Sequence, residues 1–387
     1  TAIWGSQQTE LRNEGKYDGV FGLWYGKGPG VDRCGDVFRH SNLAGTSKYG
    51  GVLVAMGDDH SAESSTELHQ SEYALVDAMM PILSPAGVQD ILDFGIKGWA
   101  LSRYSGLWVG IKCLKDTIEV TEVVDAAYDR IKIVDPQDKD HEELNIRLGD
   151  TPPAREDRLH NKKLRAAKIF ARANKLDKVD YSPTEKKIGI ISAGKSWLDT
   201  VHALSLLGID REEAEKYKLT TLKLGMVWPI DDGFVKDWAD GLDKILVVEE
   251  KRGLIESQVK EALYGMVNSP KIIGKHDDNG ELLLPSNGVL DPIIVGKAIA
   301  NKLIGSSKSE KLENALNSMS IGSRSEANTP APDRIPYFCS GCPHNSSTKI
   351  PEGSIAYAGI GCHTMAIWMD RATDGPTHMG GEGINWI

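Results

Sequence analysis

Three cysteines near the end of the sequence have the type and spacing of metal ligands. Cys339 and Cys342 are separated by two residues, and Cys362 follows later in the chain. Two thiols at this spacing can bind one metal centre from a tight turn, and thiolates are the ligands that zinc sites and iron–sulfur clusters share. The pattern therefore predicts a metal site at Cys339, Cys342 and Cys362. A structural zinc site and ordinary buried thiols remain the alternatives, because no fourth cysteine lies nearby.

The residues around Cys362 have the pattern of an anion-binding turn. Residues 354–362 predict a buried strand that ends in a glycine turn, and residues 363–369 can open a helix. Exposed amides in such a turn, together with the positive end of a helix dipole, favour an anionic ligand. Gly359, Gly361 and His363 are therefore candidate cofactor-binding residues.

A second group of polar residues follows a predicted strand at residues 52–56. Asp58, Asp59 and His60 come directly after it, with Ser64, Ser65 and Gln70 shortly behind. In α/β folds this position is the carboxyl edge of the sheet, where ligands bind. This position predicts that polar side chains of the run face a ligand. The alternative for the serines is a helix cap, since Asp and Ser are favoured at helix starts.

A glycine-rich loop at residues 26–30 precedes a pair of opposite charges, Asp32 and Arg33. Glycine allows a ligand to approach the backbone, and proline fixes a kink. Lys27 or Arg33 would suit a carboxylate or a phosphate, and only Arg offers a planar two-pronged match. The alternative is a tight surface loop without a ligand.

Residues 189–196 contain the letters of a phosphate-binding loop of nucleotide hydrolases. In such a loop the first glycine follows a strand, but Gly189 lies inside the predicted strand 187–192. The segment before it, residues 184–187, is too charged to form a buried strand. The pattern therefore indicates an ordinary turn between a strand and a helix.

The composition restricts the possible classes of protein. The chain has 387 residues, of which 40% are hydrophobic and 26% are charged, as in globular proteins with two or three domains. A net charge of −10 argues against a nucleic-acid partner. The sequence contains no apolar run long enough to cross a membrane and no recognisable leader, so a cytoplasmic location is expected. The absence of an initiator methionine at Thr1 suggests a piece of a longer polypeptide.

The order of predicted strands and helices indicates an α/β fold with several doubly wound, Rossmann-like domains. Residues 1–125 form the first α/β domain, residues 126–183 a charged helical connector, and residues 184–305 a second α/β domain. Residues 306–332 are rich in Ser, Asn and Pro and are expected to be a linker. Residues 333–387 would begin a third domain.

Several long runs resemble one enzyme family, and they extend over the whole chain. They are residues 22–33, 57–65 and 69–72, and the stretch 337–387, which includes the run 379–386. Their sequences are similar to the thiamine-diphosphate-dependent 2-oxoacid:ferredoxin oxidoreductases, and most closely to the large fused bacterial type of the indolepyruvate branch. The resemblance implies transketolase-like folds: a pyrimidine-binding domain at 1–125, a transketolase-C-terminal-like domain at 184–305 and the start of a diphosphate-binding domain at 333–387.

The resemblance also implies cofactors and ligands. Thiamine diphosphate, Mg²⁺ and a 4Fe–4S cluster are expected. Cys339, Cys342 and Cys362 correspond to three of the four cluster ligands, and Gly359, Gly361, His363, Gly380, Gly381 and Gly383 to cofactor-binding residues. The cofactor-activating glutamate is expected just before Thr1, and the magnesium motif after Ile387.

The implied reaction is oxidative decarboxylation of an aryl 2-oxoacid, indole-3-pyruvate, to an acyl-coenzyme A. Coenzyme A and ferredoxin would be the partners of a homodimeric enzyme, with His60, Ser65 and Arg33 as candidate catalytic residues. Two alternatives remain: another 2-oxoacid such as pyruvate or phenylpyruvate as the substrate, or a non-catalytic scaffold stabilised by zinc.

Overall fold

The computed structural model describes residues 1–13, 15–62, 68–127, 129–138, 144–305, 309–324, 335–359 and 361–376. It divides into two compact units, Thr1–Ser320 and Ile321–Ile387. Ser65, Gly380, Gly381 and Gly383 lie outside the described residues. Within the described part of the chain, no helix is both long and apolar enough to cross a membrane.

The first unit contains two five-stranded sheets. In the first sheet the strand order is β1-β2-β4-β3-β8, and β1, β2, β4 and β3 run parallel. Its strands are β1 (Phe21–Lys27), β2 (Gly51–Asp58), β3 (Ile82–Leu83), β4 (Val109–Leu114) and β8 (Met226–Trp228). Its helices are α1 (Ala2–Ser6), α2 (Gly28–Arg33), α3 (Gly35–Ala44), α4 (Glu72–Asp77), α5 (Val88–Ser105) and α6 (Lys115–Ile118). A short 3-10 helix covers Thr9–Arg12.

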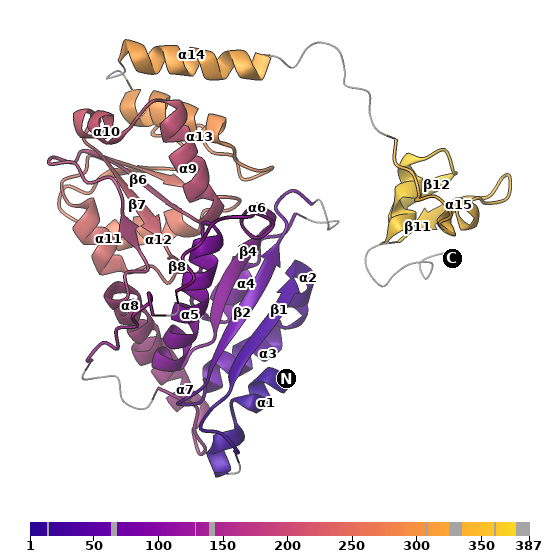
Figure 1. Cartoon of the computed structure of the whole chain (residues 1–387), viewed down its shortest axis with the longest axis horizontal. Helices are drawn as coiled ribbons and strands as arrows, with labels where there is room; N and C mark the ends of the chain where they lie inside the picture. Colours follow the sequence, from indigo (N-terminus) through magenta and orange to yellow (C-terminus); the bar gives the residue numbers. More distant parts are fainter. Residues whose placement is uncertain are drawn as a thin grey trace. The chain divides into compact units, whose positions relative to one another are not determined.

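The second sheet has the order β10-β9-β6-β7-β5, with a parallel core of β10, β9, β6 and β7. Its strands are β5 (Lys178–Val179), β6 (Ile188–Ala193), β7 (Leu219–Leu224), β9 (Lys244–Val248) and β10 (Lys271–Ile273). Its helices are α9 (Gly194–Leu206), α10 (Arg211–Tyr217), α11 (Asp232–Ala239), α12 (Leu254–Leu263) and α13 (Pro292–Ala298), which continues as a π-helix over Ile299–Ile304. The two sheets are visible in the lower and upper parts of the first unit in Figure 1.

The expected α/β architecture is confirmed. The connector contains α7 (Pro152–Arg158), a π-helical turn (Leu159–Lys163) and α8 (Leu164–Ala173), and α8 packs against α5. Gly189 lies inside β6, as predicted, with Trp238 packed so closely that a Cβ at residue 189 would lie 2.7 Å from its ring. The segment expected to be a linker contains α14 (Glu310–Arg324).

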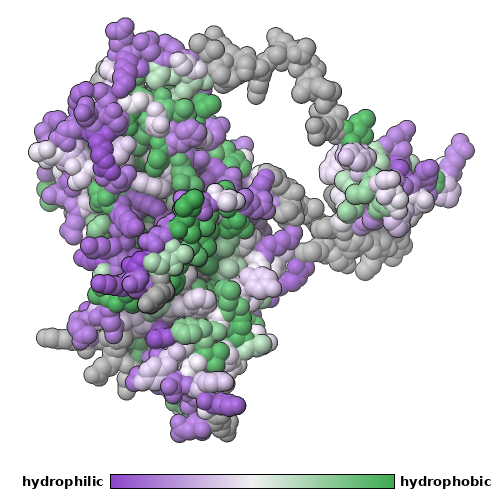
Figure 2. Space-filling view, in the orientation of Figure 1, coloured by the Kyte–Doolittle hydropathy of each residue, from purple (hydrophilic) through white to green (hydrophobic). Residues whose placement is uncertain are grey.

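One apolar core extends across both sheets of the first unit. Buried residues from the first sheet, such as Val54 and Ile82, belong to the same cluster as Ile191 and Val247 of the second. Strand β8 also joins the sheets, because it follows β7 in the sequence but pairs antiparallel with β3. On the face shown in Figure 2, hydrophobic surface gathers near the middle of this unit, between hydrophilic regions. The shared core fixes the two sheets relative to each other.

The second unit is small. Its described elements are α15 (His344–Ser347), β11 (Ala356–Ala358), a 3-10 helix (Cys362–Trp368) and β12 (Thr373–Pro376), and β11 pairs parallel with β12. The prediction of a buried strand at residues 354–362 was wrong, because β11 has only three residues and Ile355 and Tyr357 are exposed. The helix expected after the glycine turn is present as the short 3-10 helix.

Candidate functional site

A hollow of about 290 Å³ lies at the carboxyl edge of the first sheet, where β1, β2 and β4 end. Parallel strands of an α/β sheet present their carboxyl ends at one edge, and ligands of such folds bind there. The residues that line the hollow include Lys27, Gly28, Gly57, Asp58 and His69. Further lining residues are Pro29, Asp59, Cys113, Lys115, Ile118 and Glu119.

Asp58, the last residue of β2, is the buried anchor of this site. The backbone N–H of Ser71 donates to both carboxylate oxygens, at 3.1 and 3.0 Å, and the Ser71 hydroxyl donates to Oδ1 at 2.5 Å. Burial alone would raise the pKa of Asp58, but hydrogen bonds from His69 and Ser71 and the charge of Lys112 lower it to about 2. Asp58 is therefore a fixed negative charge at neutral pH.

His69 lies between two carboxylates. Its Nδ1 is 3.5 Å from Asp58 Oδ1, and its Nε2 is 3.1 Å from Oδ2 of Asp32, on α2. The hydrogen bond with Asp58 is the main cause that raises the pKa of His69 to about 9, and Asp32 adds to it. Gly28 is required here, because a Cβ at that position would lie 2.2 Å from Cγ of the His69 ring. The site therefore holds an imidazolium at neutral pH.

His60, which was predicted to face the substrate, lies on the other side of Asp58 and is buried. Its Nε2 is 3.9 Å from Asp58 Oδ2, and its Nδ1 is 3.9 Å from Oε2 of Glu250. Among the described residues neither ring nitrogen has a hydrogen-bond partner. Burial, followed by the charge of Lys112, lowers the pKa of His60 to about 2, so its ring is neutral.

A buried ion pair lies beside these residues. Lys112 of β4 pairs with Glu72, the first residue of α4, and its Nζ is also 3.9 Å from Asp58 Oδ2. Burial opposes the charge of Lys112, but Glu72 and Asp58 raise its pKa. Burial raises the pKa of Glu72, whose Oε2 has no hydrogen-bond partner among the residues described. Lys112 therefore links the first-sheet carboxylates.

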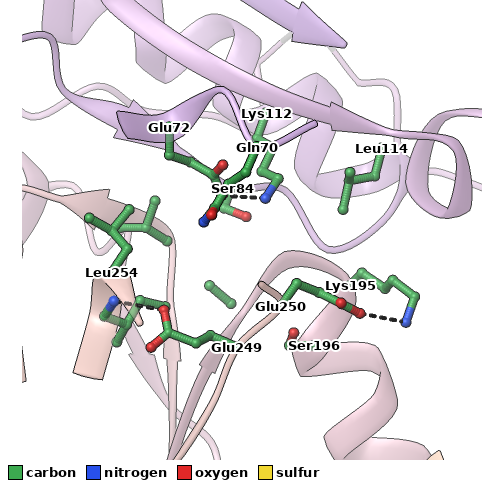
Figure 3. Close-up of a pocket in the computed structure, with 13 residues that line it drawn as sticks. Gln70, Glu72, Ser84, Lys112, Leu114, Lys195, Ser196, Glu249, Glu250 and Leu254 are labelled. Atoms are coloured by element: carbon green, nitrogen blue, oxygen red, sulfur yellow. Dashed lines mark hydrogen bonds and ion pairs between the residues drawn. The ribbon is translucent and has the colours of Figure 1, made fainter. Parts of the chain in front are cut away.

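The carboxyl edges of the two sheets face each other across a smaller cavity of about 30 Å³, shown in Figure 3. Glu72, Lys112 and Gln70 lie on the side of the first sheet. Glu249, Glu250 and Lys195 lie on the side of the second sheet. A cavity of this size has room for about one water molecule.

Most polar groups on the second-sheet side of this cavity are held by protein partners. Lys195 Nζ donates to Glu250 at 3.1 Å and to Asp199 at 2.7 Å. Glu249 accepts from the backbone N–H groups of Ile255 and Glu256 in the first turn of α12, at 2.7 and 2.9 Å. Burial nevertheless raises the pKa of Glu249 to about 7.

Arg33, a second predicted catalytic residue, does not line the hollow. It is exposed at the end of α2, with Nη1 3.5 Å from the carbonyl oxygen of Pro29. Lys27, the alternative from the same loop, does line it. The residues that sequence reasoning missed are His69, Glu72 and Lys112.

The candidate cysteines all lie in the second unit and are all free. Cys339 and Cys362 are exposed, and the half-buried Cys342 has its Sγ 3.2 Å from Nδ1 of His344. Within the described ranges, no three His, Cys, Asp or Glu side chains are close enough to hold a metal ion. The donors have the right chemistry for a cluster, but they do not converge in this structure.

The glycine turn before Cys362 is closed by its own side chains. The backbone N–H of Gly359 donates to Nε2 of His363 at 3.1 Å, and the imidazole rings of His363 and His344 stack at 6.0 Å between centroids. Gly361 has a φ of 137°, which favours glycine. An anion at this turn would have to replace His363 at the Gly359 amide.

Comparison with known proteins supports one family. Residues 178–326 match the model of the indolepyruvate oxidoreductase domain. The indolepyruvate oxidoreductase subunit IorA of Methanothermobacter thermautotrophicus is 26% identical over 369 residues, which cover 90% of this chain and 54% of the relative. The subunit of the same name from Pyrococcus abyssi is 25% identical over 364 residues, covering 91% and 53%. The chain thus spans about half the length of these relatives.

A solved structure shows the same fold. The 2-oxoglutarate:ferredoxin oxidoreductase from Magnetococcus marinus superposes with a TM-score of 0.50 at 14% identity, covering 78% of this chain and 55% of that one. The predicted fold class, and the resemblance to the indolepyruvate oxidoreductases recognised in the sequence, are therefore confirmed.

Proposed function

We propose that this chain forms part of an enzyme that oxidises and decarboxylates an aryl 2-oxoacid, with indole-3-pyruvate as the preferred substrate. The observation that carries the proposal is the similarity of 90% of the chain to an indolepyruvate oxidoreductase subunit. The hollow at the carboxyl edge of β1, β2 and β4 adds structural support, because it places charged groups where such folds bind ligands. Coenzyme A would take the acyl group, and ferredoxin would take the two electrons.

Thiamine diphosphate, when bound, would supply the electron sink for loss of carbon dioxide. Oε2 of Glu72, which has no hydrogen-bond partner among the described residues, lines the small cavity between the two sheet edges and would suit a hydrogen-bond donor there. The chain's own contribution would be a rigid wall at the carboxyl edge, with Asp58 ionised, His69 protonated and His60 neutral. Ser65 and Arg33 stay candidates for contacts with the substrate.

Two parts of the proposal concern the second unit and its cofactors. Cys339, Cys342 and Cys362 would hold a 4Fe–4S cluster after rearranging, since they do not converge here. Gly359, Gly361 and His363, together with Gly380, Gly381 and Gly383, would approach the diphosphate and its Mg²⁺. We also propose a homodimer in the cytoplasm.

The proposal is tested by an anaerobic assay of the complete protein with thiamine diphosphate, Mg²⁺, coenzyme A and a viologen dye as electron acceptor. A ring buried in a matched pocket gains about 1.5–3 kcal/mol over a methyl group. Indolepyruvate and phenylpyruvate should therefore exceed pyruvate in kcat/KM by roughly ten- to two-hundredfold. An equal kcat/KM for pyruvate would mean that an aryl 2-oxoacid is not the preferred substrate. Dye reduction that does not depend on any 2-oxoacid would overturn the proposal.

Metal analysis tests the cysteine assignment separately. Cys342→Ser should lose iron and the absorption of the cluster, because a hydroxyl is a poor replacement for a thiolate on iron. Cys113→Ser is the matched control, since Cys113 is a free cysteine of the first unit. Iron retained in full by the Cys342 variant would make this thiol structural only, and zinc alone in the wild type would favour the scaffold alternative.

A further inference from the structure

The two carboxylates that hold His69 differ strongly in how firmly they are fixed. The side chain of Asp58 is fully buried, and three hydrogen bonds from Ser71 lock it in place. The side chain of Asp32 is 60% exposed on α2. One carboxylate is therefore a permanent part of the site, whereas the other can leave His69 at small cost, because exposed ion pairs are weak in water.

We propose that Nε2–H of His69 is the receptor for the carboxylate of the 2-oxoacid, and that the Asp32 side chain occupies the same place until the substrate binds. This inference rests on the proposed function, because it names the group of the site that binds the negatively charged carboxylate of the substrate. His69 would determine specificity for an acid over a neutral analogue.

The orientation of the ring supports this role. Ser71 Oγ and Asp58 Oδ1 lie 3.1 and 3.5 Å from Nδ1, so the buried side of the ring is occupied by the protein. The ring also packs on the backbone at Gly28, which leaves no room for a Cβ. With Nδ1 engaged on the protein side, Nε2 is the ring atom available to a ligand that displaces Asp32.

The protonation state fits a hydrogen-bond donor rather than a base. Because its two carboxylate neighbours raise the pKa of His69 to about 9, both ring nitrogens carry protons at neutral pH. A charged donor binds a carboxylate more strongly than a neutral donor does. The other charged groups lining the hollow are Lys27, Asp59, Lys115 and Glu119, together with Asp58, the partner of His69 Nδ1. Lys27, Asp59 and Lys115 are already engaged in interactions with the protein.

Two stable probes separate charge from shape: indole-3-propionate carries the carboxylate, and indole-3-propionamide is its neutral counterpart of nearly equal size. Titration calorimetry on the full chain at pH 7 should give the carboxylate about 10- to 100-fold higher affinity than the amide, the range expected for one hydrogen bond between charged groups. His69→Gln should reduce this ratio to nearly one. Asp32→Ala should tighten carboxylate binding several-fold without affecting the amide.

A matched control uses an exposed histidine that also pairs with an aspartate. His40 Nε2 lies 3.5 Å from Asp36 on the exposed side of α3, away from the hollow, so His40→Gln should leave both affinities unchanged. The exposed position of Asp32 makes Asp32→Ala a second test that does not depend on how His69→Gln folds.

Three outcomes would refute the proposed role of His69: an unchanged ratio of carboxylate to amide affinity in His69→Gln, weaker carboxylate binding in Asp32→Ala, or no binding of indole-3-propionate by the wild type. The 2-oxoacid assay is read separately. If the protein prefers the carboxylate probe through His69 but shows no dye reduction that depends on a 2-oxoacid, the proposed function is refuted and the role of His69 stands. If the protein turns over 2-oxoacids normally but His69→Gln keeps the wild-type ratio of affinities, the role of His69 is refuted and the proposed function stands.

Discussion

His60 and His69 lie on opposite sides of the same carboxylate, yet they carry different charges. Asp58 Oδ1 is 3.5 Å from Nδ1 of His69, and Asp58 Oδ2 is 3.9 Å from Nε2 of His60. The pKa of His69 is raised to about 9, mainly by its hydrogen bond with Asp58. The pKa of His60 is lowered to about 2, mainly by burial.

The comparison shows that a nearby carboxylate does not by itself make a histidine cationic. His60 has a second carboxylate, Glu250, at 3.9 Å, but no hydrogen-bond partner for its ring among the described residues. Without a hydrogen bond to the charged form, the cost of removing imidazolium from water dominates. The charges of Lys112, Lys251 and Lys195 add to this cost.

The largest effect is expected for Lys112, because its charge acts both on Asp58 and on His60. Lys112→Met leaves the carboxylate of Glu72 buried and unpaired, and breaking a buried pair in this way costs about 3–5 kcal/mol. We expect a loss of this size in the free energy of unfolding, measured by urea denaturation. It would also remove the cation that most depresses the pKa of His60.

Lys216→Met is the control for this substitution. Lys216 pairs with Glu213 three residues before it, and its side chain is 66% exposed, so its loss should leave the free energy of unfolding almost unchanged. The double variant Lys112→Met/Glu72→Leu should recover much of the loss, because both buried charges are then gone. Equal costs for Lys112→Met and Lys216→Met would refute a buried ion pair.

The next effect is the acid sensitivity that His60 confers. Its folded pKa of about 2 lies below the ordinary value of 6.5, so below pH 6.5 the unfolded chain binds a proton that the folded protein does not. Stability is lost as the pH falls, by about 1.4 kcal/mol per pH unit and so about 2 kcal/mol by pH 5. His60→Phe should remove this slope, which urea denaturation between pH 7 and 5 measures.

Only the difference between wild type and variant isolates His60. Glu249 acts in the opposite direction, because burial raises its pKa to about 7 and the folded protein then binds the extra proton. His40→Phe, at an exposed position of α3, should keep the wild-type slope. An undiminished slope in His60→Phe would mean that His60 is protonated in the folded protein and resembles His69.

Much of the fold follows from local sequence. The apolar runs that became β2, β6 and β9 predicted strands because both faces of a parallel sheet are buried, which gives continuous hydrophobic stretches. Strands β3 and β8, with two and three residues, could not be predicted this way. Their pairing of Ile82 with Trp228 joins segments distant in sequence, and no local pattern encodes it.

The site was only partly predictable for the same reason. Position after a strand placed His60 at the carboxyl edge, but its surroundings include Glu250 and Lys251, which follow β9 of the second sheet. Lys251 Nζ donates to the carbonyl oxygen of His60 at 2.7 Å. The pairing of His69 with Asp58 depends on how the chain returns to the end of β2. Residues 69–72, noted in the sequence only for their resemblance to the family, thus contain His69, the protonated histidine of the site.

The smallest expected effect is on the stability that His69 contributes at neutral pH and that is lost in alkali. Its folded pKa of about 9 lies above the ordinary value of 6.5, so its contribution is complete below pH 6.5 and is lost as the pH rises through about 9. His69→Gln should therefore be less stable than wild type at pH 6, by about 1 kcal/mol or less because the partner Asp32 is exposed. The two proteins should converge near pH 10, in urea denaturation over this range.

Two controls keep this prediction specific to His69. Cys113, whose pKa burial raises, also loses a proton in alkali, but it is present in both proteins and cancels in the difference. High salt should reduce the difference only in part, because it screens the exposed pair with Asp32 but not the buried one with Asp58. If the difference instead stayed constant from pH 6 to 10, His69 would not lose a proton in this range, and the contrast with His60 would rest on packing alone.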